Sequence, residues 1–292
     1  MRAHLIVNTY RPAALEATRE TVAWLRAAHV EVGVETDAAV HVDAPAITPQ
    51  ALGDADVVIC MGGDGTLIRA THLIGDKGTP IVGVNFGRFG FVCAIPPERR
   101  HEALERFFAG HAEVNDRLMI ETQLLRERKQ VATLHVLNEA VVQRAATTRM
   151  LTFDVTVNGQ LLAHYPADGV MVSTPTGSTA YNLSAGGPIV HPEVPAFILT
   201  AVMPHTLSAR PMILNDQAEV EIAIETRGDA VLSCDGHSRL TLLSGDTVCV
   251  RRSPRVTRLV GFSEDDFLFK VSEKFGWSRR GPFSDPEPEE SC

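Results

Sequence analysis

Apolar runs alternate with helix-spaced segments in the first third of the chain. Runs at 4–9, 30–34, 57–61 and 80–84 predict buried strands. Helical spacing of apolar residues extends from Pro12 to Ala28, begins again after Thr66 and returns at 97–109. Strands that alternate with helices predict an α/β domain with a parallel sheet, whose ligands bind at the carboxyl ends of the strands.

The pattern becomes β-rich after residue 112. Short alternating segments are separated by turn dipeptides such as Asn158-Gly159, Asp235-Gly236 and Gly245-Asp246. Asn158-Gly159 predicts a tight type I′ hairpin between strands at 153–157 and 160–162. We expect an antiparallel second domain, a helix at 265–275 and a mobile tail at 281–292, where prolines and acidic residues gather.

Composition narrows the class of protein. The 292 residues include 27 basic and 36 acidic side chains, a net charge of -9, and no basic block, which argues against nucleic-acid or anionic-membrane binding. The five cysteines are odd in number and form no Cys-x-x-Cys pair, which argues against a disulfide framework or a zinc site. The chain shows no signal peptide and no run of about 18 apolar residues. We therefore expect a cytoplasmic protein that does not span a membrane.

The turn Gly62-Gly63-Asp64-Gly65-Thr66 follows the apolar run at 57–61 and precedes a helix. Glycines at a strand end allow a phosphate to approach backbone N–H groups. A carboxylate does not bind an anion itself, so we expect Asp64 to act next to the phosphate, as a base or through a metal ion. The alternative is that Asp64 only caps the helix.

A second small-residue turn lies at 173–181, after Asp168 and a short apolar run. Five hydroxyl residues fall within seven positions there, and Tyr181 and Ser184 follow them. Such a segment suits hydrogen bonds to ribose or amide groups, with Tyr181 stacking on a flat ring. Ser178 and Thr179 are also good helix caps, which is the simpler interpretation.

Two weaker patterns accompany these turns. Asn138-Glu139 follows an apolar stretch, and Arg88 lies in a glycine-spaced loop at 83–91, where it is a candidate phosphate contact. The sequence contains no P-loop lysine motif, no Gly-x-Gly-x-x-Gly, no His-Glu-x-x-His and no Gly-x-Ser-x-Gly.

Taken in this order, the motifs resemble those of the NAD kinase family over nearly the whole chain. The glycine turn alone also occurs in lipid kinases and phosphofructokinases, whereas the segment at 173–181 is far more restrictive. Further matching stretches lie at 137–139, 183–188, 204–211 and 274–277. The resemblance implies phosphorylation of the 2′-hydroxyl of the adenosine ribose of NAD, with ATP or polyphosphate as donor and Mg²⁺ arriving with ATP. It also implies a homodimer or homotetramer and no protein-bound metal.

The resemblance also implies a domain division and residue roles. Residues 1–112 would form the α/β nucleotide-phosphate domain and 113–262 the β-rich NAD-binding domain, with a helix at 263–280 returning to the first domain before the tail at 281–292. Asp64 would be the general base. The implied contacts to NAD or ATP are Gly62, Gly63, Gly65, Arg69, Asn138, Glu139, Arg149, Asp168, Thr179, Ala180, Tyr181, Asn182, Leu183, Ser184 and His237.

Two positions depart from the family pattern. His237 stands where glutamine is common, which makes a ligand contact sensitive to pH. Pro166 stands at a variable position associated with substrate preference and offers no side-chain donor or charge. The choice between NAD and NADH therefore stays open.

Two other functions were compatible with part of the pattern. A lipid kinase shares the glycine turn but needs an apolar entrance for an acyl chain, and the hydroxyl-rich segment suits a nucleoside better. A sensor that binds NAD or NADPH without catalysis would have no need for Asp64.

Overall fold

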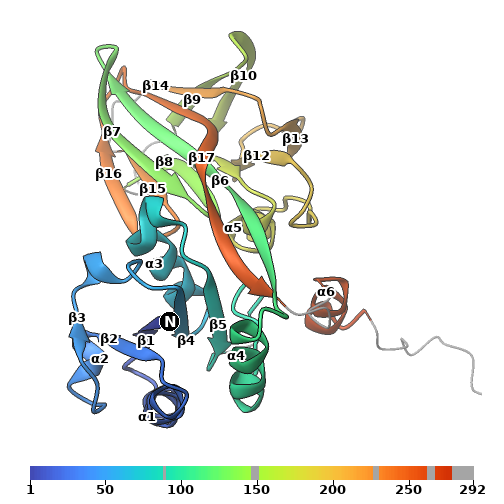
Figure 1. Cartoon of the computed structure of the whole chain (residues 1–292). Coiled ribbons are helices and arrows are strands. Elements are labelled where there is room, and N and C mark those ends of the chain that lie inside the picture. The colour runs from blue at the N-terminus through green and yellow to red at the C-terminus, as the bar shows by residue number, and fades with distance from the viewer. Residues whose placement is uncertain (88–89, 146–150, 226–229, 262–266, 278–292) are drawn as a thin grey trace, which may run out of the picture.

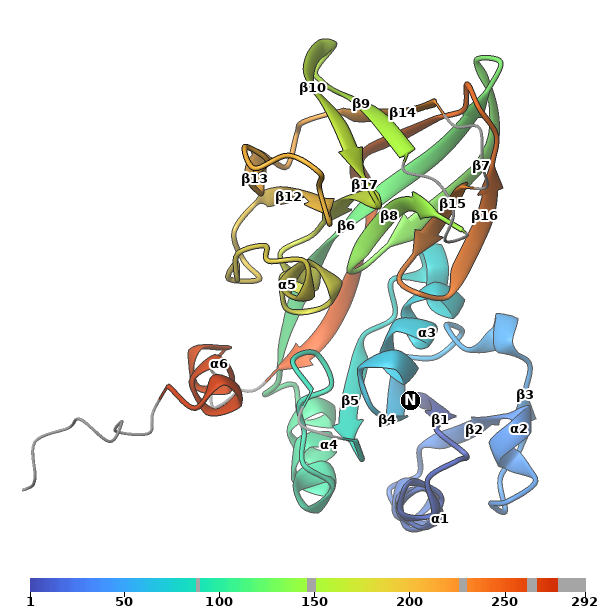
Figure 2. The same cartoon turned by 180° about the vertical axis from the view of Figure 1, so that it is seen from behind.

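The computed structural model describes residues 1–87, 90–145, 151–225, 230–261 and 267–277. It has two layered domains stacked end to end, and two long strands run from one into the other (Figures 1 and 2). The tail at 281–292 lies outside the described residues.

The first domain is built on a parallel sheet. Its strand order is β3-β2-β1-β4-β5, and each neighbouring pair is parallel. The strands are β1 (Arg2–Val7), β2 (Glu31–Glu35), β3 (Ala46–Ile47), β4 (Val57–Gly62) and β5 (Ile81–Asn85). Every residue of β4 is buried, as expected of a central strand that helices cover on both faces. The predicted α/β class is confirmed.

Helices cover the two faces of this sheet. The helical elements are α1 (Pro12–Ala27), α2 (Thr36–Ala39), α3 (Asp64–Ile74), α4 (Arg100–Phe108), and the 3-10 turns η1 (Pro49–Ala51), η2 (Gly75–Lys77) and η3 (Pro97–Arg99). Leu25 of α1 and Leu104 of α4 share one core with β1 and β4. Leu67 and Ile74 of α3 pack on the opposite face, in a core that also contains Met119 and Leu137 of the second domain. The helix α3 therefore packs against both domains.

The second domain is a sandwich of antiparallel strands. One layer is β8-β11-β12-β13 with β15 and β16, and the facing layer continues the first sheet through β6, β7, β9, β10, β14 and β17. The bounds are β6 (Glu113–Arg126), β7 (Lys129–Val136), β8 (Glu139–Arg144), β9 (Leu151–Val157), β10 (Gln160–Ala167), β11 (Gly169–Ser173), β12 (Ala196–Val202), β13 (Met212–Asn215), β14 (Val220–Glu225), β15 (Ala230–Cys234), β16 (Ser238–Leu242) and β17 (Thr247–Gly261). Phe153 and Phe197 are fully buried between the layers.

The predicted hairpin at Asn158-Gly159 joins β9 to β10. Its residues have φ of 50° and 76°, the left-handed conformation of a type I′ turn. Asp235 and Gly236, with φ of 50° and 69°, join β15 to β16 in the same way.

Strands β6 and β17 form a long antiparallel ribbon that connects the domains (Figure 1). At its far end Leu259 of β17 pairs with Ile81 of β5, in parallel. The ribbon is interrupted by a register shift between Arg252 and Val256, at the level where the domains meet. The parallel sheet and one layer of the sandwich are thus hydrogen-bonded into one continuous sheet.

The last described helix, α6 (Phe267–Phe275), packs on both domains. Phe267 and Phe275 lie 6.2 and 6.4 Å from the ring of Phe91 in the first domain. Phe267 also meets His191 of the second domain edge to face, at 5.2 Å. The expected return of the final helix is therefore observed at Phe91, with an additional contact to the second domain.

No helix in the described part of the chain is both long and apolar enough to cross a bilayer. The four described cysteines, Cys60, Cys93, Cys234 and Cys249, are free thiols.

Truncating Phe153 tests the sandwich core. Because its side chain is fully buried between the two layers, Phe153→Ala should lower the free energy of unfolding by about 3 to 5 kcal/mol. Urea denaturation measures the loss. Phe269→Ala, which truncates a side chain that is 59% exposed, is the matched control and should change stability by less than about 1 kcal/mol. Equal losses in the two variants would contradict the assignment of this core.

Candidate functional site

The glycine turn joins the buried strand β4 to the amino end of α3. Gly63 is the N-cap in an extended conformation, and its carbonyl accepts hydrogen bonds from Thr66 and Leu67 at 3.0 and 3.1 Å. The N–H groups of a first helical turn have no partner within the helix and carry partial positive charge. The turn therefore presents a backbone surface suited to an anion at the carboxyl end of β4.

The three glycines of the turn serve different purposes. A Cβ on Gly62 would lie 2.3 Å from Thr66 Oγ1, so the fold itself requires this glycine. A Cβ on Gly63 would meet only Asn85 Oδ1, at 3.8 Å, and one on Gly65 would meet no atom within 4 Å. Internal packing therefore does not explain Gly65, and the space beside it is open to a ligand.

The carboxylate of Asp64 is held by backbone N–H groups of the loop after β5. Oδ1 accepts hydrogen bonds from Val92 and Cys93 at 3.3 and 2.7 Å, and Oδ2 accepts one from Phe91 at 3.0 Å. A Cβ on Gly90 would lie 2.3 Å from Asp64 Oδ1, so only glycine allows this approach. The Asp64 carboxylate thus binds a neighbouring loop. It does not cap its own helix, which is the alternative role that the sequence allowed.

Lys274 of α6 also reaches this region. Its Nζ lies 4.0 Å from the centre of the Phe91 ring, a cation–π contact. Burial lowers the pKa of Lys274, and the charge of Asp64 acts in the opposite direction. The C-terminal helix therefore places an ammonium group in the field of the Asp64 carboxylate.

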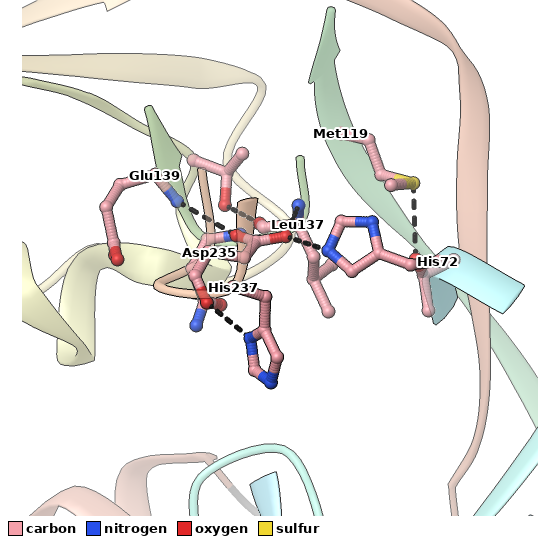
Figure 3. A network of polar contacts seen from close by, with 9 residues as sticks. His72, Met119, Leu137, Glu139, Asp235 and His237 are labelled. Atoms are coloured by element: carbon pink, nitrogen blue, oxygen red, sulfur yellow. Dashed lines mark hydrogen bonds and ion pairs between the residues drawn. The ribbon is translucent and has the colours of Figure 1, made fainter. Parts of the chain in front are cut away.

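Asp235 is the centre of a buried polar network in the second domain (Figure 3). Its carboxylate accepts hydrogen bonds from three consecutive backbone N–H groups, those of Leu137, Asn138 and Glu139, at 2.7 to 3.3 Å. The Asp235 N–H in turn donates to the Glu139 carbonyl at 3.0 Å. The backbone of Asn138-Glu139 is therefore fixed from the β15–β16 turn.

The same carboxylate connects the two domains. Nε2 of His72, on α3, lies 2.9 Å from Asp235 Oδ2, and the aspartate side chain is fully buried. Figure 3 shows the His72 ring between Asp235 and Met119. Asp64 is the first residue of α3. The Asp235 carboxylate therefore contacts both the helix that carries Asp64 and the segment that carries Asn138 and Glu139.

Asn138 and Glu139 each present a buried oxygen without a partner among the described residues. These atoms are Asn138 Oδ1 and Glu139 Oε2, on side chains only 7% exposed. Burial, with a smaller contribution from Asp235, raises the pKa of Glu139 to about 7, and a hydrogen bond from the Tyr181 N–H opposes the rise. Buried polar atoms normally have hydrogen-bond partners. These two oxygens are therefore candidate acceptors for hydrogen bonds from a ligand.

The hydroxyl-rich segment is mainly tied to the protein itself. Ser173 Oγ and Thr174 Oγ1 donate to the carbonyls of Asn138 and Leu137, at 3.1 and 2.5 Å. Ser178 Oγ exchanges hydrogen bonds with Val190, and a Cβ on Gly177 would lie 2.2 Å from the Asn138 carbonyl oxygen. Ser173, Thr174 and Ser178 are fully buried. Their hydroxyls therefore have a structural role, where the sequence predicted hydrogen bonds to ribose.

The ligand-accessible part of this segment lies further along. It follows η4 (Thr176–Thr179) and continues through Ala180 into α5 (Tyr181–Ser184), which contains Leu183. Tyr181 is 38% exposed, whereas Asn182 is fully buried, bonding through Nδ2 to the carbonyls of Ser178 and Pro188 and through Oδ1 to Thr200. The structure thus gives Tyr181 an open ring and assigns Asn182 to the scaffold.

A cavity of about 320 Å³ lies beside the glycine turn. Gly65, Thr66 and Arg69 line it from α3, and His237 lines it from the second domain. His237 Nδ1 lies 2.8 Å from the Asp235 carbonyl oxygen, which orients the ring. Arg69 forms a two-point ion pair with Glu35, at 2.5 and 2.6 Å, so its charge is already paired in this structure.

The remaining predicted residues lie elsewhere. Asp168 precedes β11 and pairs with Arg144 at 2.7 Å, whereas Ser173 at the other end of β11 pairs with Glu139. At about 3.3 Å per residue, Asp168 is roughly 16 Å from that end. Arg149 and Arg88 lie outside the described residues.

Three residues that contribute to the site carried no assigned role in the sequence. Asp235 was recognised only as part of a turn dipeptide, His72 as one of eleven scattered histidines, and Lys274 as part of a matching stretch. Only the spacing of His72, eight residues after Asp64, could have placed it on α3 near the second domain. The partners of the other two are set by tertiary structure.

Within the described ranges, no three His, Cys, Asp or Glu side chains are grouped closely enough to hold a metal ion.

Two family models match most of the chain. Residues 4–112 match the ATP-NAD kinase N-terminal domain, and residues 137–262 match the ATP-NAD kinase C-terminal domain. The NAD kinase of Citrifermentans bemidjiense is 36% identical over 283 residues, covering 94% of this chain and 98% of that protein. The NAD kinase of Heliobacterium modesticaldum is 37% identical over 279 residues, with the same coverage.

Solved structures share the fold. A yeast NADH kinase complexed with NADH superposes with a TM-score of 0.91 at 25% identity, covering 98% of this chain and 90% of that one. An NAD kinase from Archaeoglobus fulgidus in complex with ATP has a TM-score of 0.77 at 23% identity, covering 94% and 98%. The second likeness bears on the fold alone.

The different purposes of Gly62 and Gly65 can be separated by stability. Gly62→Ala forces a methyl group against the stiff side chain of Thr66 and should lower the free energy of unfolding by more than about 2 kcal/mol. Gly65→Ala meets open space and should stay within about 1 kcal/mol of the parent. Urea denaturation of both variants measures the two changes in free energy of unfolding. A loss of stability in Gly65→Ala as large as in Gly62→Ala would contradict the open space observed beside Gly65.

The raised pKa of Glu139 predicts a pH-dependent contribution to stability. The folded protein holds this proton up to about pH 7 and the unfolded chain only to about 4.5, so the contribution is full below pH 4.5 and is lost as pH rises to 7. The loss should reach about 3 kcal/mol at most. In Glu139→Gln this loss of stability with rising pH should vanish, as measured by urea denaturation from pH 4.5 to 8.

Glu221→Gln, which changes an exposed glutamate of the same domain, is the control and should lose stability with rising pH as the parent does. If Glu139→Gln showed the same pH dependence as the parent, Glu139 would not be the group that titrates.

Proposed function

The chain belongs to the NAD kinase family, and from that membership we propose that it transfers the terminal phosphate of ATP to the 2′-hydroxyl of the adenosine ribose of NAD, forming NADP. The observation that carries this proposal is the pairing of two features in one site. An oriented carboxylate lies at a glycine turn, and two buried oxygens without partners lie on the segment anchored to the same helix.

The donor triphosphate is assigned to the glycine turn. Backbone N–H groups at the start of α3 and the open space at Gly65 support a phosphate there. Asp64 is the one carboxylate of the turn, and it already accepts three N–H bonds, so Mg²⁺ would be held mainly by the triphosphate. When bound, the ion supplies charge neutralisation on the transferred phosphoryl group.

Asp64 is assigned as the general base. Its three N–H bonds fix the carboxylate at the amino end of α3, and Oδ2, which accepts only one of them, retains lone-pair capacity for a substrate hydroxyl. Phosphoryl transfer depends chiefly on positioning and charge, so the base removes the hydroxyl proton as the new O–P bond forms. Lys274 adds positive charge on the same side.

The nucleoside of NAD is assigned to the second domain. Asn138 Oδ1 and Glu139 Oε2 accept donors from the adenosine, and Tyr181 offers a ring for stacking. Thr179, Ala180, Leu183 and Ser184 would complete this wall, with His237 between it and the glycine turn. Gly62 supports the glycine turn against Thr66, and Asn182 supports the nucleoside wall from within, so neither is assigned a ligand contact.

The position of Asp168 supports assembly of the enzyme as a homodimer or homotetramer. It lies roughly 16 Å along β11 from the end that meets Glu139. A role for Asp168 in binding the nicotinamide half would therefore suit a site to which a second copy of the chain contributes. We assign the enzyme to the cytoplasm, in keeping with its free thiols.

Replacing Asp64 tests the assignment of the base. Asp64→Asn keeps an oxygen for Val92 and Cys93 but has no basic carboxylate, so kcat for NADP formation should fall by about 10² to 10⁴. NAD binding, measured by calorimetry, should change little. Asp43→Asn, at an exposed carboxylate far from the turn, is the control and should retain the parent rate.

Turnover of Asp64→Asn at the parent rate would remove Asp64 as the base. A coupled assay that crosses NAD and NADH with ATP and polyphosphate tests the overall function and identifies acceptor and donor. Binding of NAD without product in any combination would favour a sensor, and a phospholipid formed from diacylglycerol and labelled ATP would favour a lipid kinase.

A further inference from the structure

A second cavity, of about 340 Å³, lies at the carboxyl end of α3. Its walls come from both domains: Thr71 from α3, Met119 from β6, Thr133 from β7 and Arg255 from β17. It is distinct from the glycine turn, because Thr71 is seven residues beyond Asp64, about 10 Å along the helix axis.

The ionisable residues that line this cavity are basic. Arg255, Arg258, His72 and His135 contribute to it, and no Asp or Glu occurs among the described lining residues. This is unusual in a chain with a net charge of -9. The two guanidinium groups suit an anion, whereas burial lowers the pKa of His135 and favours its neutral form.

The two guanidinium groups have acidic partners on the solvent side. Arg255 binds Asp76 at two points, through Nε to Oδ1 and through Nη2 to Oδ2 at 2.9 Å, and Arg258 lies 3.5 Å from Asp116. Both carboxylates are well exposed, 78% and 61%, and face solvent. A guanidinium carries five N–H donors, so each arginine retains donors for a ligand.

Two buried hydroxyls of the lining have no partner among the described residues. They are Thr71 Oγ1, on a residue 6% exposed, and Thr133 Oγ1. Thr257 Oγ1 donates to the weak acceptor Met119 Sδ, at 3.3 Å. Hydroxyl and guanidinium donors together match the oxygens of a phosphate.

Much of the remaining lining is apolar. Ile74, Ile81, Leu134 and Val256 form a surface suited to an organic group rather than to a free ion. We infer that this cavity is a second binding site, which takes a phosphate monoester of a small organic molecule. Its occupant would contact His72, the residue that faces Asp235, and would bridge α3 to β17.

Calorimetric titration of the full chain with glycerol 3-phosphate, in the absence of ATP and NAD, tests the site independently of turnover. Binding should weaken at least tenfold in Arg258→Gln and at least threefold in Thr133→Val, which removes only a hydroxyl. Arg239→Gln, at an exposed arginine of β16 outside the cavity, should bind like the parent.

Inorganic phosphate is the second probe and should bind several-fold more weakly than the ester, because it does not cover the apolar wall. No binding of the ester to the parent at 10 mM, or equal binding to all three variants, would overturn the site. Equal affinity for both probes would overturn the ester as its ligand. Thermal unfolding of each variant verifies that it is folded.

Discussion

One buried carboxylate organises the candidate site. Asp235 accepts three consecutive N–H groups at the start of β8, where strand pairing does not satisfy them, and it faces His72 of the other domain. These contacts orient Asn138 and Glu139 and fix the distance from them to α3. The Asp64 carboxylate and the Asn138-Glu139 segment belong to different domains, so their relative geometry depends on this interaction.

The surrounding structure supports that anchor in two ways. The β6–β17 ribbon joins the first sheet to one layer of the second domain, and α6 packs on both Phe91 and His191. Phe91 also donates to Asp64. Asp64 is therefore held from three directions: by its own helix, by the loop after β5, and by α6 packed on that loop.

Much of the fold follows from local pattern. The bounds of β1, β2, β4, β5 and α1 lie within two residues of prediction and the Asn158-Gly159 turn is where it was predicted, because periodicity and turn residues are local properties. Strand β10 continues to Ala167, beyond the predicted end at 162, and the short strand β3 was not predicted. The glycine turn and Asn138-Glu139 were also evident. The sequence did not reveal that Ser173 and Thr174 would serve the scaffold, or that Asp235 would be an anchor. Those roles depend on which backbone groups the tertiary fold leaves unpaired, and no local pattern encodes that.

The pairing of Leu259 with Ile81 has a consequence for synthesis. The outer edge of β5 receives this partner only after about 180 further residues have been made, and until then Ile95 provides just one local bridge at Val84. During translation the nascent first domain therefore exposes an incomplete sheet edge, a surface prone to aberrant pairing. The first domain to emerge from the ribosome is therefore among the last to be completed.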